Sequence, residues 1–129
     1  MEIKHEFFPL RDETDLIIGL AIEVHKILGN GFLEVVYKDA MQYEFNLNGV
    51  FYEREKVYDV PYKSIILAHR FYADFVVFDK IIIEVKAKNS IANEDLSQTI
   101  NYLKCSGCGV GLILNFGKSK LEIKRLVFN

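Results

Sequence analysis

The chain has 129 residues, of which half are hydrophobic and about a quarter are charged, and its formal net charge at pH 7 is −2. This length fits a single domain over residues 1–129, and the mixed composition excludes a disordered or low-complexity chain. The longest apolar runs contain charges and are shorter than the ~20 residues of a membrane span, so no membrane association is expected. The slightly acidic balance argues against a protein that coats nucleic acid indiscriminately, although a local cationic groove stays possible.

A cytoplasmic location is expected. The start of the chain, MEIKHEFFPLRDE, has charges on both sides of two phenylalanines and lacks the apolar core of a secretory signal. Cys105 and Cys108 form a CSGC pair, but a structural zinc site needs four ligands and no second pair follows. We interpret both as small core-facing thiols in a reduced compartment. The alternative is a redox or zinc module that takes a second pair from another chain.

Two helices are predicted in the first part of the chain. Thr14 can cap a helix that has Asp15 in its first turn and ends at Gly29. A second helical pattern covers residues 33–48 and ends at Gly49. Its expected apolar stripe consists of Leu33, Val36, Ala40, Tyr43 and Leu47.

Strands are predicted after residue 50, where the hydrophobic period changes from about 3.6 to 2. Residues 50–60 alternate, a turn is expected at 61–63, and three further strands are expected at 65–69, 70–78 and 80–87. Asn93 can then cap a helix that extends to Cys105, and two more strands follow. A crossover helix between strands favours an α/β sandwich with a central mixed β-sheet flanked by helices.

Charge occurs in a strand that otherwise reads as buried. In IIIEVKAKN, residues 81–89, Glu84 and Lys86 lie two positions apart and therefore point to the same face. Asp74 has an equally apolar setting in YADFVVF. A three-residue loop at 78–80 would place Asp74 opposite Glu84, whereas a two-residue loop would place the acids on opposite faces unless a bulge intervened.

Two carboxylates brought together in an apolar sheet repel each other and lose hydration, unless one is protonated or a cation lies between them. Mg²⁺ would resolve this, because it takes carboxylate and carbonyl oxygens and keeps several waters. Lys86 would aim a second positive group at the same place, an arrangement suited to phosphodiester hydrolysis. The alternative is an ordinary salt bridge on a solvated sheet face.

The residues also carry a resemblance. The D(x)9ExK pattern of Asp74, Glu84 and Lys86 resembles the core of the PD-(D/E)XK nuclease superfamily, whose restriction-endonuclease-like fold is a mixed sheet flanked by helices. GFLEVVY, residues 31–37, is similar to the signature of the GxxExxY family of that superfamily. VHKILGNGFLEVVY, ADFVVFDKIIIEVKA, QTINYLK and GLILNFG follow one another in that family's order, so the resemblance covers roughly residues 15–127.

The resemblance implies roles for single residues. Asp74 and Glu84 resemble the metal ligands, with the carbonyl of Val85 as a third, and Lys86 matches the catalytic lysine. Glu34 resembles the helix acid that completes the metal site and also acts in catalysis. The implied cofactor is Mg²⁺, for which Mn²⁺ can substitute. A separate role for Glu34 is to stabilise the start of its helix through the helix dipole.

Three further residues are expected to contact substrate. Gln98 and Tyr102, in QTINY, resemble the QxxxY element of RecB-like nucleases, which approaches the active site and the DNA. Tyr37, which shares a helix face with Glu34, is the third. An amphipathic helix with a polar outer face is the alternative explanation of Gln98 and Tyr102. Ala73 stands where the superfamily name has proline, and two cysteines are too few for the iron–sulfur cluster of some relatives.

The sequence therefore predicts a metal-dependent nuclease, with DNA as the expected substrate. Because an acidic chain binds nucleic acid weakly by itself, a homodimer or a protein partner is also expected. The alternative function is a catalytically silent nucleic-acid-binding or assembly module of the same fold. The choices between DNA and RNA, and between endonuclease and exonuclease, stay open.

Overall fold

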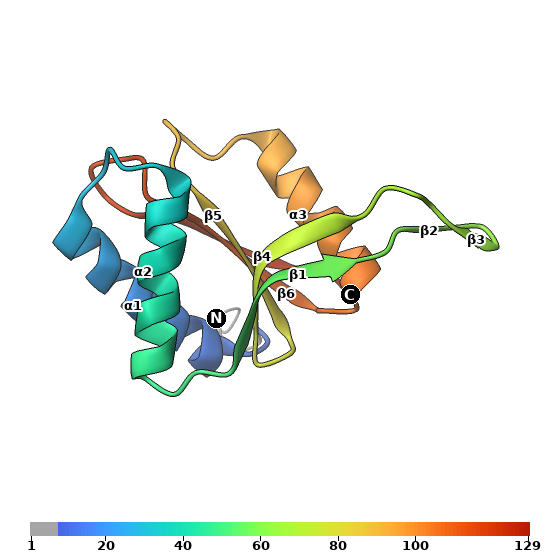
Figure 1. Cartoon of the computed structure of the whole chain (residues 1–129), viewed down its shortest axis with the longest axis horizontal. Coiled ribbons are helices and arrows are strands. Elements are labelled where there is room, and N and C mark those ends of the chain that lie inside the picture. The colour runs from blue at the N-terminus through green and yellow to red at the C-terminus, as the bar shows by residue number, and fades with distance from the viewer. Residues whose placement is uncertain (1–7) are drawn as a thin grey trace, which may run out of the picture.

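The computed structural model describes residues 8–129, which contain three helices and seven strands (Figure 1). The helices are α1 (Arg11–Leu28), α2 (Glu34–Leu47) and α3 (Asn93–Ser106). The strands are β1 (Tyr52–Tyr58), β2 (Pro61–Tyr62), β3 (Ile65–Ile66), β4 (Phe71–Val77), β5 (Ile81–Lys86), β6 (Val110–Asn115) and β7 (Glu122–Val127). Among these residues, none of the helices has the length and apolar character needed to span a membrane.

Five strands form one mixed sheet in the order β1-β4-β5-β6-β7. β5 and β6 run parallel and the other neighbours run antiparallel. A parallel pair needs a long crossover, and α3 provides it between β5 and β6. The helices α1 and α2 cover one face of the sheet, while α3 lies on the other (Figure 1). The predicted α/β sandwich with a central mixed sheet is confirmed.

Helix α2 buries a different stripe from the one predicted. Tyr37, Met41 and Phe45, at i, i+4 and i+8, are fully buried against the sheet. Leu33 and Leu47, from the predicted stripe, are 76% and 66% exposed. Both stripes have helical spacing, so periodicity alone could not choose between them, and the helix turns Tyr37, Met41 and Phe45 into the core.

The predicted helix starts were also displaced. Helix α1 begins at Arg11, before the predicted cap, and the Thr14 hydroxyl donates a hydrogen bond to the Arg11 carbonyl (3.0 Å) inside the first turn. Gly29 does end this helix, with φ 69°. In α3 the residue before the helix is Ala92, whose amide donates to the Asp95 carboxylate (2.8 Å).

The segment around residues 61–66 differs most from the prediction. It was expected to contain a turn followed by a strand of the main sheet. Instead β2 and β3 form their own two-stranded hairpin, with Tyr62 paired to Ile65, which projects beyond the rest of the domain (Figure 1). Every residue from 61 to 70 is exposed. The apolar run here therefore does not mark a core strand.

Candidate active site

The loop between β4 and β5 has three residues. Val77 pairs with Ile81, and the amide of Lys80 donates a hydrogen bond to the carbonyl of Val77 (3.1 Å). Phe78 and Asp79 both have positive φ, 56° and 62°. Of the two registers that the sequence left open, the structure therefore has the one that aligns the two acids, Asp74 with Glu84.

The regular backbone pairing between β4 and β5 stops at these acids. Its last regular pair is Phe75 with Ile83, although β4 continues beside β1 and β5 continues beside β6. Beyond that pair the amide of Asp74 donates to Glu84 Oε2 (3.1 Å), and the amide of Val85 donates to Asp74 Oδ2 (2.8 Å). Each carboxylate thus takes the place of a backbone carbonyl as the acceptor, which fixes both acids at the seam between the strands.

The two carboxylates lie in a poorly hydrated place. Glu84 is 5% exposed, and the side chain of Asp74 is 17% exposed. Burial, and then the negative charge of Asp74, raise the pKa of Glu84 to about 8. Near neutral pH the Glu84 carboxyl therefore holds its proton readily, and a cation placed between the acids would release it.

Lys86 follows Glu84 on the same face of β5, and its ammonium lies near a third acid, Asp95. Its ammonium lies 3.9 Å from Asp95, a buried carboxylate in the first turn of α3, and Lys88 lies 2.7 Å from the other oxygen of that group. Burial alone would raise the pKa of Asp95, but the amide of Ala92 and the Lys88 ammonium together lower it. Asp95 is thus an ionised group that restrains both lysines, and the sequence analysis missed it.

Helix α2 contributes two charged residues to the site. Glu34 is exposed at its start, but partial desolvation, and then the charge of Asp74, raise the pKa of Glu34. Lys38, one turn later, lies 3.1 Å from Asp74 Oδ1 and 3.0 Å from Glu55 Oε2, and its side chain is only 12% exposed. Lys38 was not predicted, although its spacing of four from Glu34 would have put both residues on one helix face.

Tyr37 supports the site from within the core. The side chain is fully buried, its hydroxyl donates to the carbonyl of Gly29 (2.6 Å), and that hydroxyl accepts from the amide of Phe32 (3.2 Å). Its ring stacks on Phe116 at 4.6 Å. A ring in this position shapes the loop before α2. Because the side chain is fully buried, nothing in the described residues supports the substrate contact predicted for Tyr37.

The two α3 residues lie in different surroundings. Tyr102 is half-buried and stacks on Phe71 (4.0 Å between ring centroids, 3° between planes). Burial, and then the charges of Glu84 and Asp74, raise the pKa of Tyr102, so its hydroxyl lies in the field of the acid pair. Gln98 is exposed on the surface of the helix. The structure therefore brings Tyr102 toward the acids and leaves Gln98 facing solvent.

A buried amide holds the lysine segment in place. The Asn115 side chain donates to the carbonyl of Lys88 (3.0 Å) and accepts from its amide (3.0 Å) and from that of Gly117 (3.1 Å). Gly117 is required because a Cβ there would lie 2.3 Å from the Lys88 carbonyl oxygen. GLILNFG thus fixes the chain just after Lys86, a role that the sequence analysis did not assign to it.

The carboxylates of Asp74 and Glu84 are the candidate metal ligands of this site. In the described part of the chain, no group of three or more His, Cys, Asp and Glu side chains is gathered closely enough to hold an ion. Mg²⁺, however, binds through one or two carboxylates and keeps several waters. The paired oxygens of Asp74 and Glu84 fit that requirement, and Glu34 lies close enough for the charge of Asp74 to raise its pKa.

The cysteines lie outside this site. Both thiols are free, Cys108 is buried in the apolar cluster beneath α3, and Cys105 is half-buried. This placement agrees with the core-facing interpretation and leaves the redox or zinc module without an exposed pair.

Comparisons with known proteins agree with the fold. The family model of the PD-(D/E)XK nuclease superfamily matches residues 11–126. The solved crystal structure of SSO0001 superimposes with a TM-score of 0.52 at 14% identity, over 71% of this chain and 48% of that one. The chain thus spans about half the length of that protein. No curated protein matches. The chain belongs to the PD-(D/E)XK nuclease superfamily.

Proposed function

We propose that this protein is a metal-dependent nuclease that hydrolyses phosphodiester bonds in DNA. The observation that carries the proposal is the Asp74–Glu84 pair, locked by two backbone hydrogen bonds, with Lys86 on the same face of β5. Carboxylates held this rigidly at a seam in the sheet are costly for a structural role. They become useful when a cation and an anionic substrate meet there.

Mg²⁺ is the proposed metal, and Mn²⁺ would substitute. Asp74, Glu84 and the carbonyl of Val85 would hold it, and Glu34 would complete the site from the start of α2. Once bound, the metal would lower the pKa of a bound water and neutralise charge on the leaving oxygen. Because Glu84 must lose its proton to bind a cation, loading of the site depends on pH.

Lys86 is the proposed catalytic lysine. A half-buried ammonium next to the acid pair can orient the attacking water or bind a phosphate oxygen. Its ammonium lies 3.9 Å from Asp95, an ion pair that favours this position of the side chain. Lys88, held at 2.7 Å from Asp95, adds a second positive charge to the same edge.

Substrate contacts are proposed for Tyr102 and Gln98. Tyr102 presents a half-buried aromatic ring close to the acids, and such rings stack on bases in single-strand channels. Gln98, one turn earlier on α3, is exposed and can donate to the backbone of the DNA.

The GFLEVVY segment supports membership of the GxxExxY family, and the free thiols support a reduced, cytoplasmic setting.

A cleavage assay tests this function. Wild type, Asp74→Asn and Asp79→Asn would be incubated with single- and double-stranded DNA over a range of Mg²⁺ concentrations. Asp79 is a matched control because it is an exposed aspartate only five residues away, in the β4–β5 loop. Metal-dependent cleavage that Asp74→Asn abolishes and Asp79→Asn retains would support the proposal. Cleavage unaffected by Asp74→Asn would reject it.

A catalytically silent binding or assembly module of the same fold is the second candidate. Two observations favour it: Lys38 already neutralises Asp74 in the structure, and no three-acid cluster is gathered in residues 8–129. If wild type binds DNA without cutting it at any Mg²⁺ or Mn²⁺ concentration, this candidate replaces the first.

A further inference from the structure

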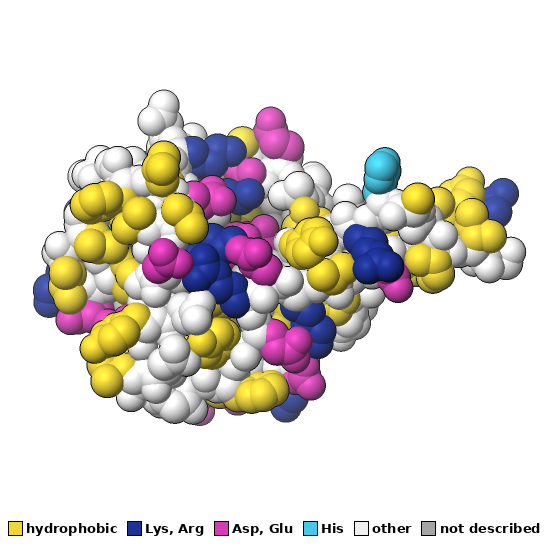
Figure 2. Space-filling model, viewed as in Figure 1, with side chains coloured by type: hydrophobic (Ala, Val, Ile, Leu, Met, Phe, Trp, Pro, Cys, Tyr) yellow, Lys and Arg dark blue, Asp and Glu magenta, His cyan; other side chains and the backbone are white. Residues whose placement is uncertain are grey.

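The projecting hairpin exposes an apolar tip. Tyr62, Ile65 and Ile66 are 54%, 56% and 57% exposed, and Figure 2 shows hydrophobic side chains at the end of this projection. A two-stranded hairpin alone is marginally stable in water, and clustered exposed apolar side chains mark interaction sites. The tip is therefore suited to being covered by another surface.

One face of this tip has a defined chemistry. Tyr62 and Ile65 are cross-strand partners, so their side chains lie on the same face of the hairpin. The Lys63 ammonium lies 5.6 Å from the centre of the Tyr62 ring. Within residues 8–129 it forms no ion pair. The face thus presents one aromatic ring, one aliphatic side chain and one positive charge without an acidic partner.

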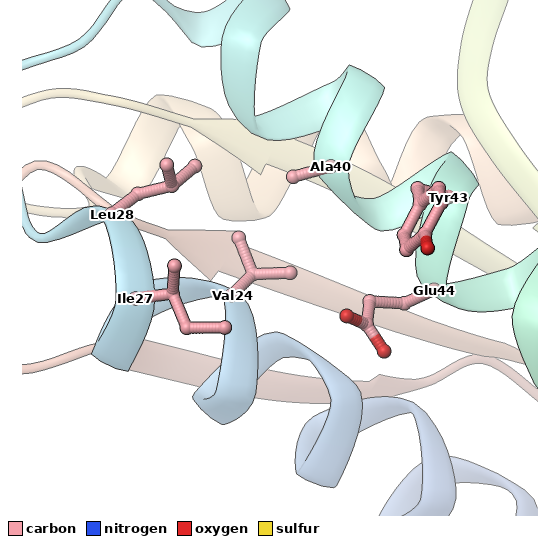
Figure 3. Close-up of a pocket in the computed structure, with 6 residues that line it drawn as sticks. All are labelled: Val24, Ile27, Leu28, Ala40, Tyr43 and Glu44. Atoms are coloured by element: carbon pink, nitrogen blue, oxygen red, sulfur yellow. The ribbon is translucent and has the colours of Figure 1, made fainter.

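A second unusual surface lies between α1 and α2. It is a groove of about 300 Å³ (Figure 3) that is lined by Val24, Ile27, Leu28, Ala40, Tyr43 and Glu44. Ile27 and Tyr43 are 69% and 64% exposed. Glu44 gives the groove a negative charge and has no ion-pair partner in the described part of the chain. The groove is therefore apolar with one unpaired acid, whereas the hairpin tip is apolar with one unpaired base.

The two surfaces match in size as well as in charge. A cavity of about 150 Å³ takes up a benzene molecule, so a groove of twice that volume has room for a tyrosine ring and an isoleucine side chain. In a single chain, the hairpin extends from one end of the molecule while α1 and α2 lie at the other (Figure 1). The hairpin therefore faces away from the groove of its own chain.

We propose that the β2–β3 hairpin of one chain docks into the α1–α2 groove of a second copy. Tyr62 and Ile65 enter the groove, and Lys63 pairs with Glu44 of the other chain. Two copies side by side in opposite directions make this contact twice about a two-fold axis, which closes the assembly as a dimer. The inference does not depend on nuclease activity, because none of these residues belongs to the acid pair or contacts it.

Nucleic acid is a less suitable occupant for the hairpin face. Protein–nucleic-acid affinity comes mainly from several lysines and arginines on phosphates, and the Tyr62–Ile65 face carries one lysine. The acid in the groove would repel a phosphate backbone. A second copy satisfies both charges at once.

Sedimentation velocity of the full chain over the micromolar concentration range tests the proposal. Wild type is expected to dimerise. Lys63→Glu and Glu44→Lys are each expected to weaken the dimer at least tenfold, because the reversed charge meets a like charge twice per dimer. The double variant Lys63→Glu/Glu44→Lys is expected to return to within a few-fold of wild type. Lys80→Glu, an exposed lysine in the β4–β5 loop, serves as the control and should leave the dimer intact.

Lys63 and Lys80 are exposed and Glu44 is half-buried in the lining of the groove, and thermal melting would verify that each variant folds. Three results would overturn the proposal: a wild-type monomer at every concentration, a double variant no better than the single variants, or an equal loss with Lys80→Glu. Variants that stay monomeric like wild type but lose affinity for DNA would instead assign the hairpin to nucleic acid.

Discussion

The amide of Asp74 donates a hydrogen bond to the carboxylate of Glu84, and the amide of Val85 returns one to Asp74 across the same seam of the sheet. The backbone thus sets the position of both acids before any ligand arrives. Sheet geometry, rather than a flexible loop, holds the two carboxylates at a place where β4 and β5 no longer pair. The acid pair is therefore preorganised to meet a cation.

The stability of the protein should fall as pH rises. In an unfolded chain Glu84 has a pKa of about 4.3, whereas burial and the charge of Asp74 raise it to about 8 in the fold. Between these values the folded chain binds the proton and the unfolded chain does not, so the stabilisation present below the lower pKa is lost as pH rises through the upper one. Urea denaturation over this range measures the decline.

Glu84→Gln should flatten that decline and stabilise the protein at alkaline pH, by on the order of 1–3 kcal/mol, because no charge is then buried. Glu94→Gln, an exposed acid at the start of α3, is the control and should keep the wild-type slope. A Glu84→Gln variant with an unchanged slope would show that Glu84 does not titrate as described.

Metal binding should release protons. A carboxyl that is largely protonated near neutral pH must ionise before it can bind Mg²⁺ or Mn²⁺, so affinity should increase with pH up to about 8. Calorimetric titrations in two buffers with different ionisation enthalpies measure the number of protons released. A value near zero at pH 7, where the Glu84 carboxyl is expected to be protonated, would contradict this coupling.

Lys38 should compete with the metal. Its ammonium lies 3.1 Å from Asp74 and neutralises the charge that a cation would use. Lys38→Met should therefore strengthen Mg²⁺ binding about tenfold and should lower the stability of the metal-free protein, because the acids lose their counter-charge. Lys56→Met is the control, since its ion pairs with Glu53 and Asp79 lie outside the site. Equal affinities in Lys38→Met and Lys56→Met would exclude competition.

Lys86 should act in the reaction rather than in metal binding. Lys86→Met is expected to reduce the cleavage rate by about 10²–10³-fold, the usual effect of removing one electrostatic stabiliser. The affinity for Mg²⁺ should change little, because the carboxylate oxygens remain in place. Lys88→Met is the comparison variant, because Lys88 contacts the same Asp95 at 2.7 Å but lies beyond the end of β5. A parallel loss of metal affinity in Lys86→Met would indicate a structural role.

Gly117 should tolerate no side chain. A Cβ there would lie 2.3 Å and 2.4 Å from backbone atoms of Lys88, so Gly117→Ala must push the lysine segment away and should destabilise the fold by more than about 2 kcal/mol. Gly19→Ala is the contrasting variant, because its site within α1 is open and alanine favours a helix by about 1 kcal/mol. Thermal melting of both variants checks the difference. Equal melting temperatures would contradict the close approach.

The sequence could predict the mixed sheet and the shared face of Glu84 and Lys86 because both depend on local rules, but it left the register of Asp74 against Glu84 open. Alternation placed Glu84 and Lys86 on one face, and the loop after Val77 set the register. Lys38 was missed because Glu55 and Asp74 are distant from it in sequence, and Asp95 was missed because its lysine partners lie outside its helix. Side-chain reach across elements has no periodic signal. The α2 stripe failed for a related reason, since two helical stripes were possible and only packing against the sheet selected that of Tyr37.

The central claim is that Asp74 and Glu84 form a metal site, and calorimetric titration of Mg²⁺ into wild type and Asp74→Asn tests it most directly. The account predicts saturable binding in wild type that Asp74→Asn abolishes while its thermal unfolding remains cooperative. Binding of equal affinity in both proteins, or none in wild type with DNA present, would contradict it and leave the acid pair with a structural role.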